Sequence, residues 1–331
     1  MRVGIVGAGG VAQAFHLPVL EQTQAVQIVW ICDTHLPRAR ELARRFRVPK
    51  VFDDIRRCTD VDAALVAIPV GCRDGVYEEL LARQWHVFAE KPVARSARAH
   101  DGLVTGARAA GVEVCAALVR RLYQSTTLAK RLFATDVFGP PVEVWATQGA
   151  RLYASQRGAD WYQADPSAGG GGVLMEAGSH LVDQLFFVLD VTSFCDVRAD
   201  MTIIDGIDVD VRAAAILTTA TQQSVPVRIA LSHTTDLPGG IVIRYQHATI
   251  RLGIEPDSPL SLETEHGRAV ACLNGDDRGA RTLYQAFYLE WEAFLEQCRS
   301  RTPSVIDAAT ALAGAEFLDA VYSAARSAVA R

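Results

Sequence analysis

The sequence lacks the features that mark membrane spans, secretion signals and nucleic-acid-binding surfaces. No apolar stretch in its 331 residues reaches the roughly 18 residues that a membrane-spanning helix needs. The first residues, Arg2–Val6, have the pattern of a strand and not the charged and apolar regions of a signal peptide. The net charge is −5 and there is no long basic run, so nucleic acid has no electrostatic footprint here. We therefore expect neither a membrane nor a nucleic-acid partner.

Cysteine is also sparse and without a recognisable pattern. The 7 cysteines include no Cys-x-x-Cys pair, which favours reduced, mostly buried thiols in a cytoplasmic protein. No cysteine lies in a reactive motif, so a catalytic thiol is not the favoured interpretation. His233, His247 and His266 are far apart in a region of strand pattern, where exposed or internally bonded histidines are a simpler explanation than a metal site. No metal is predicted.

Residues 1–118 alternate short strands rich in Val and Ile with helical segments, in a chain long enough for two sizeable cores. This alternation predicts a parallel sheet covered on both faces, and six strands complete a doubly wound dinucleotide-binding sheet. The predicted strands are Val3–Val6, Gln27–Cys32, Lys50–Phe52, Ala63–Ile68, His86–Ala89 and Val112–Ala116. The predicted helices include Leu36–Phe46, Gly75–Gln84 and Ala97–Ala110.

The rhythm changes after about residue 119. Strands then follow one another without long helices between them, which predicts an open, mainly antiparallel sheet. We therefore expect an α/β domain over residues 1–118 and an α+β domain over residues 119–331. The strands predicted for the second domain are Val142–Gln148, Val197–Ile203, Val209–Thr219, Val225–Ser232, Ile241–Gln246 and Ala248–Gly253. Its predicted helices are Gln124–Ala134, Val173–Leu189, Leu283–Cys298 and Ala308–Ala328.

A glycine-rich turn joins the first predicted strand to a helix. Its pattern, Gly-x-Gly-x-x-Ala, stands between strand and helix as the dinucleotide fingerprint requires. Gly7 permits the tight turn, Gly9 lets a pyrophosphate approach the backbone, and Ala12 allows close packing of helix and strand. The free N–H groups of the helix start then bind phosphate. The predicted turn residues are Gly7, Gly9, Gly10, Val11 and Ala12; a structural glycine-rich turn is the alternative.

Asp33 ends the second predicted strand, about 20–25 residues after these glycines, where an acid accepts hydrogen bonds from the adenosine ribose. A carboxylate at this position repels the 2′-phosphate of NADP, so we predict NAD as the cofactor. Arg38 follows five residues later and could reach a phosphate, so NADP is not excluded. Alternatively, Asp33 only caps the helix that begins near Leu36.

Two further segments carry acid–base residues. Glu90, Lys91 and Pro92 follow the fifth predicted strand, whose carboxyl end should face the cofactor cleft, and proline there permits a cis bond. Glu176 and His180 are four residues apart, and Asp183 follows three later, so all three share one helix face. Gly178 within this helix disfavours it by roughly 1 kcal/mol, which a close approach of substrate or cofactor would explain. A solvated lysine and a polar helix face are the alternatives.

With these motifs the chain resembles the glucose–fructose oxidoreductase/inositol dehydrogenase family, known as Gfo/Idh/MocA. The resemblance covers nearly the whole chain. It is carried by the glycine turn, Ala89-Glu90-Lys91-Pro92, Val119-Arg120-Arg121, Trp161, Gly170-Gly-Gly-Val-Leu174, Glu176 through Asp183, and the closing Glu290, Phe294, Asp307 and Ala308. It implies a Rossmann domain followed by a substrate-binding α+β domain whose open sheet forms a homodimer or homotetramer.

The resemblance also implies roles. Lys91 matches the lysine beside the nicotinamide and the reacting carbon, and His180 matches the residue that transfers the proton. Two positions depart from the family. Glu176 stands where dehydrogenating members have Asp, and the run Pro69-Val-Gly-Cys-Arg73 replaces Pro-Asn-x-x-His, so Arg73 serves either an anionic group or the surface. Pro69 and Glu90 complete the predicted cofactor contacts.

These features predict hydride transfer between nicotinamide and a secondary alcohol or ketone of a sugar, cyclitol or related polyol. His180 would act as the general base, Lys91 would stabilise the developing charge, and Glu176 would orient His180 or bind a hydroxyl. The alternatives are an imine or enone reductase and a non-catalytic dinucleotide sensor. The candidates for the substrate pocket are Arg120, Arg121, Tyr123, Trp161 and Tyr162, with Asp183 in a supporting role.

Overall fold

The computed structural model describes residues 1–152, 166–264, 267–269 and 279–329. The chain folds into two compact units. The first comprises Met1–Val119 and Leu283–Leu312, and the second comprises Arg120–Thr282 and Ala313–Arg331. This division differs from a single boundary after residue 118, because one late segment folds with the first unit.

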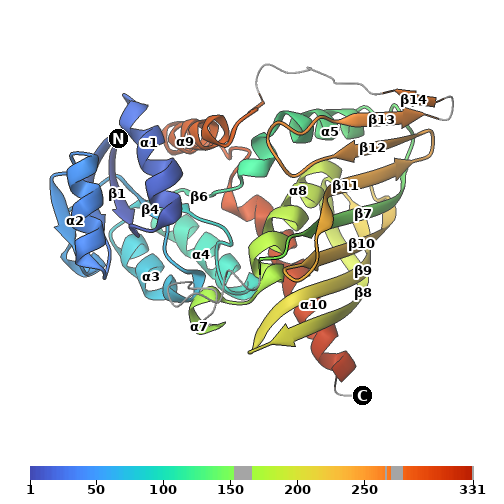
Figure 1. The fold of residues 1–331 in the computed structure, drawn as a ribbon. Helices are drawn as coiled ribbons and strands as arrows, with labels where there is room; N and C mark the ends of the chain where they lie inside the picture. Colours follow the sequence, from blue (N-terminus) through green and yellow to red (C-terminus); the bar gives the residue numbers. More distant parts are fainter. Residues whose placement is uncertain (153–165, 265–266, 270–278, 330–331) are drawn as a thin grey trace. The chain divides into compact units, whose positions relative to one another are not determined.

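A six-stranded parallel sheet forms the centre of the first unit, in the order β3-β2-β1-β4-β5-β6 (Figure 1). This is the doubly wound order expected from the sequence, in which ligands bind beyond the carboxyl ends of the strands. The strands are β1 (Arg2–Val6), β2 (Gln27–Cys32), β3 (Lys50–Phe52), β4 (Ala63–Val66), β5 (His86–Ala89) and β6 (Val114–Ala116).

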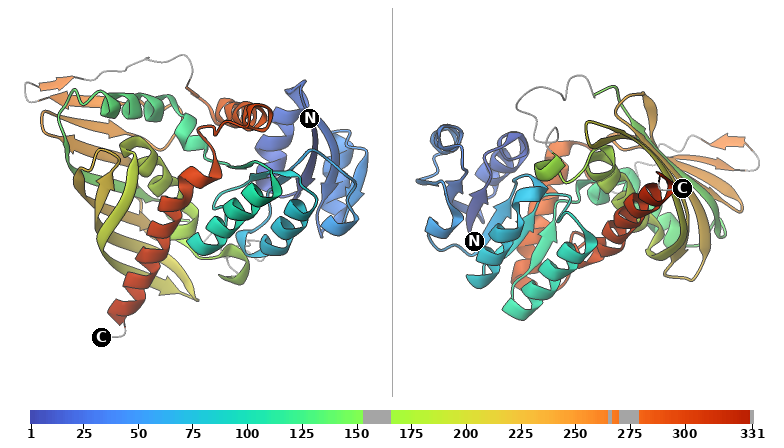
Figure 2. Two further views of the ribbon diagram at one scale, coloured as in Figure 1. Left: turned by 180° about the vertical axis from the view of Figure 1, so that it is seen from behind. Right: turned by 90° about the horizontal axis from the view of Figure 1, so that it is seen from below.

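Helices cover both faces of this sheet, as right-handed crossovers require (Figure 2). They are α1 (Leu17–Gln22), which continues the π-helical turn η1 (Ala12–His16), α2 (Leu36–Arg45), α3 (Asp74–Ala82), α4 (Ala97–Ala110) and α9 (Leu283–Ser300), with the short turns η2 (Ile55–Arg57), η3 (Val70–Cys72) and η7 (Ala308–Ala311). An aromatic cluster holds α9 in place. Phe287 stacks on Phe15 with ring centroids 4.7 Å apart, and Phe294 stacks on Phe88 at 5.1 Å. These contacts explain why α9 belongs to the first unit.

The second unit is built on an eight-stranded sheet, ordered β14-β13-β12-β11-β7-β10-β9-β8. Its strand pairs are antiparallel except β7 and β10, which run parallel. The expected open, mainly antiparallel sheet is thus confirmed, with two short strands, β13 and β14, that the pattern did not predict. The strands are β7 (Pro141–Gly149), β8 (Val191–Ile204), β9 (Ile207–Thr219), β10 (Ser224–Ser232), β11 (Leu237–Tyr245), β12 (Ala248–Leu252), β13 (Ser261–Thr264) and β14 (Gly267–Ala269).

One face of this sheet packs against helices to form the core of the unit (Figures 1 and 2). The helical segments are η4 (Val119–Leu122), α5 (Gln124–Ala134), α7 (Pro166–Gly169), η6 (Leu174–Gly178), α8 (Ser179–Leu189) and α10 (Leu312–Val329). Along β9 and β10 every second residue is buried on this face, for example Val211, Leu217 and Leu231. Within the described ranges, none of the helices has the length and apolar character that crossing a membrane demands.

Candidate active site

The glycine turn has the geometry of a phosphate cradle. Gly7 has φ +106°, and a Cβ there would lie 2.3 Å from the Ala67 carbonyl oxygen, so only glycine fits. A Cβ on Gly9 or Gly10 would meet no atom within 4 Å, which leaves open space over the turn. The N–H of Gln13 makes a helical bond to the Gly9 carbonyl at 3.0 Å. The N–H groups between Gly9 and Gln13 therefore lie in the first turn of the helix, where N–H groups have no acceptor within the helix. These residues fit a dinucleotide pyrophosphate.

Asp33 connects this turn to α2. Its buried carboxylate accepts hydrogen bonds from the N–H of Ala8 at 2.7 Å and of His35 at 2.8 Å. The Arg38 guanidinium adds bonds of 3.1 and 3.0 Å to the two oxygens. The cap of α2 is the His35 ring, which accepts from the Arg38 N–H, so the alternative role of Asp33 as the helix cap is wrong. A ribose hydroxyl bound by Asp33 would share the carboxylate with Arg38.

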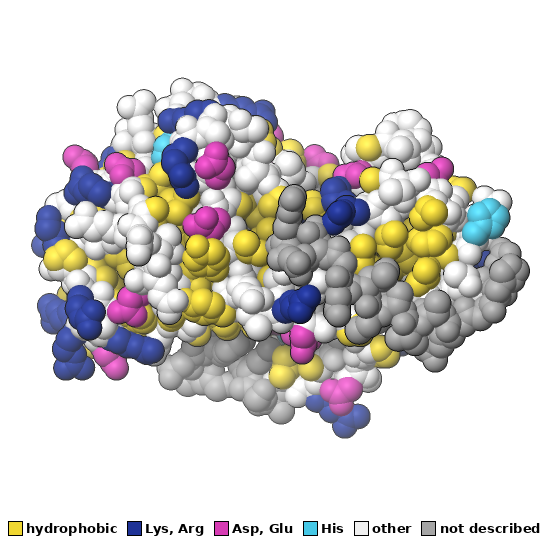
Figure 3. Space-filling view, turned by 90° about the horizontal axis from the view of Figure 1, so that it is seen from above, with side chains coloured by type: hydrophobic (Ala, Val, Ile, Leu, Met, Phe, Trp, Pro, Cys, Tyr) yellow, Lys and Arg dark blue, Asp and Glu magenta, His cyan; other side chains and the backbone are white. Residues whose placement is uncertain are grey.

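The Arg38 side chain is 48% exposed. It begins a basic surface on α2, where Figure 3 shows Lys and Arg side chains gathered at the margin of the first unit. The other exposed arginines of this helix are Arg40, Arg44 and Arg45. Positive charge next to the ribose position is compatible with a 2′-phosphate, whereas Asp33 disfavours one.

The backbone around Lys91 is clamped from α3 and the turn before it. Arg73 is only 3% exposed, and its guanidinium donates to the carbonyl oxygens of Glu90, Pro92 and Ile68. Two of these carbonyls flank Lys91 in the chain. The expectation that Arg73 serves the surface is therefore wrong, because the side chain is buried and its Nε and Nη1 are directed to backbone carbonyls. Binding of an anionic group by Arg73 stays a prediction. Pro69, which the sequence predicts to contact the cofactor, is the N-cap of η3, the short turn just before Arg73.

One more buried side chain, Tyr77, fixes the same loop. The Tyr77 hydroxyl donates to the Val93 carbonyl oxygen at 2.7 Å, and burial raises the pKa of Tyr77, so it remains a neutral donor. The Lys91–Pro92 peptide bond is cis, as the sequence permits. The backbone on either side of the partly buried Lys91 is thus fixed by Arg73, just before α3, and by Tyr77 of α3.

Glu90 belongs to a buried polar chain behind this loop. Its Oε2 accepts the Lys91 N–H at 3.0 Å, and its Oε1 bonds His16 Nε2 at 2.9 Å. Trp291 Nε1 donates to His16 Nδ1 at 3.1 Å, which leaves the proton of a neutral imidazole on Nε2, facing Glu90. Burial opposes ionisation of Glu90, but the His16 hydrogen bond and nearby positive charges outweigh it and lower its pKa. This chain was not visible in the sequence, because His16 and Trp291 are far apart in it.

In the second unit, η6 and α8 carry the predicted acid–base pair. Glu176 and His180 are both partly buried on this helical segment. Glu176 Oε2 lies 2.8 Å from Nε2 of His233, a buried histidine at the end of β10. His233 is thus buried and lies against a carboxylate of the same unit. This agrees with the expectation of a histidine that contacts other protein groups. The sequence did not indicate that Glu176 would be its partner.

Packing explains the two glycine features of this segment. A Cβ on Gly178 would lie 2.8 Å from a methyl group of Leu231, so Gly178 lets the helix pack closely on β10. A close approach of substrate or cofactor to Gly178, which the sequence suggested, stays a prediction. A Cβ on Gly172 would lie 1.9 Å from the Asp208 carbonyl oxygen, which requires glycine in the preceding loop.

Asp208 holds the start of this helix. Its carboxylate accepts the N–H of Gly172 at 2.6 Å, the N–H of Leu174 at 2.8 Å and the Tyr322 hydroxyl at 2.9 Å. Burial raises the pKa of Asp208, although these donors act in the opposite direction. Asp208 is not among the residues that the sequence predicts, since nothing local distinguishes it from other strand residues.

The arginine pair before α5 divides into two environments. Arg121 donates to both oxygens of Asp183, with contacts as short as 2.6 Å, and both side chains are buried. The structure therefore joins these two predicted substrate residues to each other. Arg120 is also buried, and it donates to Gln148 Oε1 at 3.0 Å. Tyr123 is 2% exposed, whereas Trp161 and Tyr162 lie outside the described residues.

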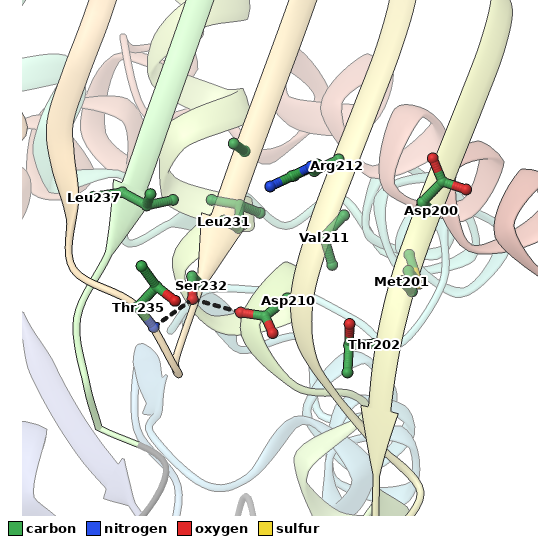
Figure 4. Close-up of a pocket in the computed structure, with 11 residues that line it drawn as sticks. Asp200, Met201, Thr202, Asp210, Val211, Arg212, Leu231, Ser232, Thr235 and Leu237 are labelled. Carbon is green, nitrogen blue, oxygen red and sulfur yellow. Dashed lines mark hydrogen bonds between the residues drawn. The ribbon is translucent and has the colours of Figure 1, made fainter.

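A cavity of about 350 Å³ lies on the second unit's sheet and involves none of the predicted site residues (Figure 4). Figure 4 shows Ser232 donating to Asp210, with the Thr235 N–H directed to the Ser232 oxygen. In the described part of the chain, no group of three His, Cys, Asp or Glu side chains is arranged to hold a metal ion. The described cysteines are free, with Cys32, Cys58, Cys115 and Cys298 buried and Cys72 and Cys195 exposed.

Comparisons with known proteins agree with this architecture. The family model described as "Oxidoreductase family, NAD-binding Rossmann fold" matches residues 1–118, and that of the Gfo/Idh/MocA C-terminal domain matches residues 126–251. Trans-1,2-dihydrobenzene-1,2-diol dehydrogenase of Sus scrofa is 25% identical over 193 residues, covering 57% of this chain and 56% of its own. Glucose-6-phosphate 3-dehydrogenase of Bacillus subtilis is 24% identical over 202 residues, covering 60% of this chain and 57% of its own.

The chain thus spans little more than half the length of these relatives. A solved structure, the aldose-aldose oxidoreductase of Caulobacter crescentus, covers 99% of this chain and 98% of its own with a TM-score of 0.85 at 13% identity, which shows a shared fold. Two matching domain models in the order that the family requires, together with the Rossmann sheet and its glycine turn, show that the chain belongs to the Gfo/Idh/MocA family of oxidoreductases, with an NAD-binding Rossmann domain.

Proposed function

We propose that this protein transfers hydride between NAD and a secondary alcohol or ketone of a sugar, cyclitol or related polyol. NAD, when bound, accepts or returns the hydride. His180 takes the hydroxyl proton as a general base, and the Lys91 ammonium donates a hydrogen bond to the same oxygen, stabilising its developing charge. Glu176, paired with His233, supplies a fixed carboxylate four residues before His180.

The observation that carries this proposal is the set of hydrogen bonds that holds the backbone around Lys91. Arg73 bonds the carbonyls on either side of it, Tyr77 bonds the next turn of the loop, and Glu90 bonds its N–H. A solvated lysine gains nothing from such support, whereas a catalytic ammonium needs a fixed position, since small displacements reduce rates strongly. The relatives' names are those of dehydrogenases acting on a diol and on a sugar phosphate, which supports the alcohol as the reacting group.

The position of Asp33 favours NAD as the cofactor. Asp33 is buried at the ribose position and tied to the glycine turn. Arg38 and the basic face of α2 keep NADP as the second candidate, so both cofactors belong in the assay. A clear preference for NADP would overturn the role that we give to Asp33.

We also propose a homodimer or homotetramer formed through the sheet of the second unit. Among the described elements, no helix covers the face opposite the core (Figure 2). Cross-strand pairing places the partly buried Trp145 and Val242 on this face, with Ile216 two rows away. Light scattering after size-exclusion chromatography tests this: a monomer at micromolar concentration would refute it.

The test of the reaction is NADH fluorescence with a panel of cyclitols, free sugars and sugar phosphates. Lys91→Met should reduce turnover by orders of magnitude while NAD affinity persists. Lys50→Met, which changes an exposed lysine of the same domain, is the matched control and should behave like the wild type. Unchanged turnover in Lys91→Met would refute the role of Lys91, and NAD binding without turnover of any alcohol or ketone would favour a sensor.

A further inference from the structure

Arg120 is a buried guanidinium with little to bind. The residue is 7% exposed, and its one hydrogen bond to a described residue runs from Nη1 to Gln148 Oε1 at 3.0 Å. A guanidinium carries five N–H donors, so most of its donors have no protein acceptor among the described residues. None of its nitrogens is among the sealed, unpaired polar atoms, so these donors reach accessible space.

The charge of Arg120 is also uncompensated locally. The neighbouring Arg121 is neutralised by Asp183, which it contacts at 2.6 Å. For Arg120, by contrast, no carboxylate oxygen in the described ranges lies within 4.0 Å. Burial lowers the pKa of Arg120 to about 10, while Tyr123, Glu255 and Asp183 act more weakly in the opposite direction. Even so, the side chain is a cation at neutral pH.

A buried cation without a counter-ion is unfavourable, and proteins keep such groups mainly where a ligand supplies the missing charge. A purely structural role would be served by a neutral side chain, since Gln148 needs only one donor. The planar fork of arginine is suited to carboxylate and phosphate oxygens, which it binds with two parallel hydrogen bonds.

We propose that Arg120, with Gln148 beside it, forms an anion-binding subsite and that the substrate is an acidic polyol, carrying a carboxylate or phosphate in addition to the reacting alcohol. This inference rests on the proposed function, because it assumes that the second unit binds the polyol. It narrows the substrate class from polyols in general to sugar acids, sugar phosphates and sugar nucleotides.

The test is calorimetric binding to the whole chain saturated with NADH, in phosphate-free buffer. NADH cannot accept hydride from an alcohol, so binding is measured without oxidation of the probe. Three arms each compare a charged probe with glucose: glucuronate for a carboxylate, glucose 6-phosphate for a phosphate monoester, and UDP-glucose for a diphosphate. The wild type should bind the charged member of at least one arm tenfold or more tightly than glucose, which corresponds to about 1.4 kcal/mol. The arm with the largest ratio identifies the source of the anion.

Arg120→Gln should bring that ratio close to one, whereas Arg326→Gln, which removes an exposed charge from α10 of the same unit, should leave it unchanged. If Arg120→Gln does not fold, Arg120→Lys decides, because its shorter, forkless side chain should lower the ratio at least threefold. The subsite is overturned if the wild type shows no preference for any charged probe, or if a folded Arg120 variant keeps the full wild-type ratio.

The two proposals fail in distinguishable ways. Charged probes that bind through Arg120 while no NADH forms with any alcohol would refute the proposed reaction and leave the anion subsite standing. Oxidation of neutral sugars with no preference for charged ones would do the reverse.

Discussion

Replacing Arg73 is the most informative perturbation of the first unit. In Arg73→Met the buried side chain stays unbranched and apolar along its stem, but it is shorter and loses every donor to the carbonyls of Ile68, Glu90 and Pro92. Each buried carbonyl left without a donor costs about 1–3 kcal/mol. Removing a desolvated charge offsets part of this loss. We therefore expect the free energy of unfolding to fall by about 3 kcal/mol. That is roughly a fifth to three fifths of the 5–15 kcal/mol typical of a domain.

The same change should slow turnover by about 100-fold, because the backbone that positions Lys91 is released and a displacement of about 1 Å has that effect. NAD affinity should fall less than turnover, because the glycine turn after β1 keeps its contacts, whereas Glu90 and Pro69 lie in or next to the released backbone. Urea denaturation followed by circular dichroism measures the first effect, and NADH formation measures the second. Arg73→Lys should be intermediate, because it keeps the charge and loses the fork.

Arg95→Met is the matched control for Arg73→Met. Arg95 lies a few residues after Lys91, but its side chain is 47% exposed and pairs with Asp74 at 2.9 Å. An exposed ion pair contributes about 0–1 kcal/mol. Should Arg73→Met retain wild-type turnover and unfold within about 0.5 kcal/mol of the wild type, the clamp that we describe has no role.

Three further changes test the remaining contacts. The folded protein lowers the pKa of Glu90 from 4.5, so the ionised form stabilises the fold above that pH, and this contribution is lost as the pH falls toward the folded pKa. In Glu90→Gln the urea midpoint should therefore fall less steeply between neutral and acidic pH than in the wild type. An equally steep fall in the variant would contradict the pairing of Glu90 with His16. Asp208→Asn should lower the free energy of unfolding by about 1–3 kcal/mol at neutral pH, as one glycine-loop N–H loses its acceptor; an unchanged urea midpoint would contradict it. His233→Phe should raise the KM for the polyol more than it changes NAD affinity, since Glu176 loses its partner; equal effects on both would indicate a general structural role.

The elements of the first unit followed from the sequence because their pattern is local. Short runs such as Gln27–Cys32 and His86–Ala89 are apolar on both faces, bounded by polar residues, and followed by amphipathic segments. The alternation of such strands with helices predicted the doubly wound sheet. The glycine turn is also a local pattern, and it predicted the phosphate cradle. The structure confirms the fold class, and the comparisons confirm the family.

What could not be predicted depends on contacts between distant residues. Nothing near Arg73 shows that its guanidinium reaches the carbonyls of Glu90 and Pro92. The same holds for His16 with Trp291 and for the parallel pairing of β7 with β10. At Gly178 the sequence suggested a ligand, and it could not show the close packing of this glycine against Leu231. Catalytic and substrate roles for Lys91, His180 and the other predicted residues remain predictions.

The most direct test of the central claim is a double-mutant cycle of turnover for Lys91→Met and His180→Asn. If both side chains act on the same alcohol oxygen, their effects are strongly non-additive, and the double variant should be no slower than the slower single variant within about threefold. Rates that multiply, with each change acting independently, would contradict the account.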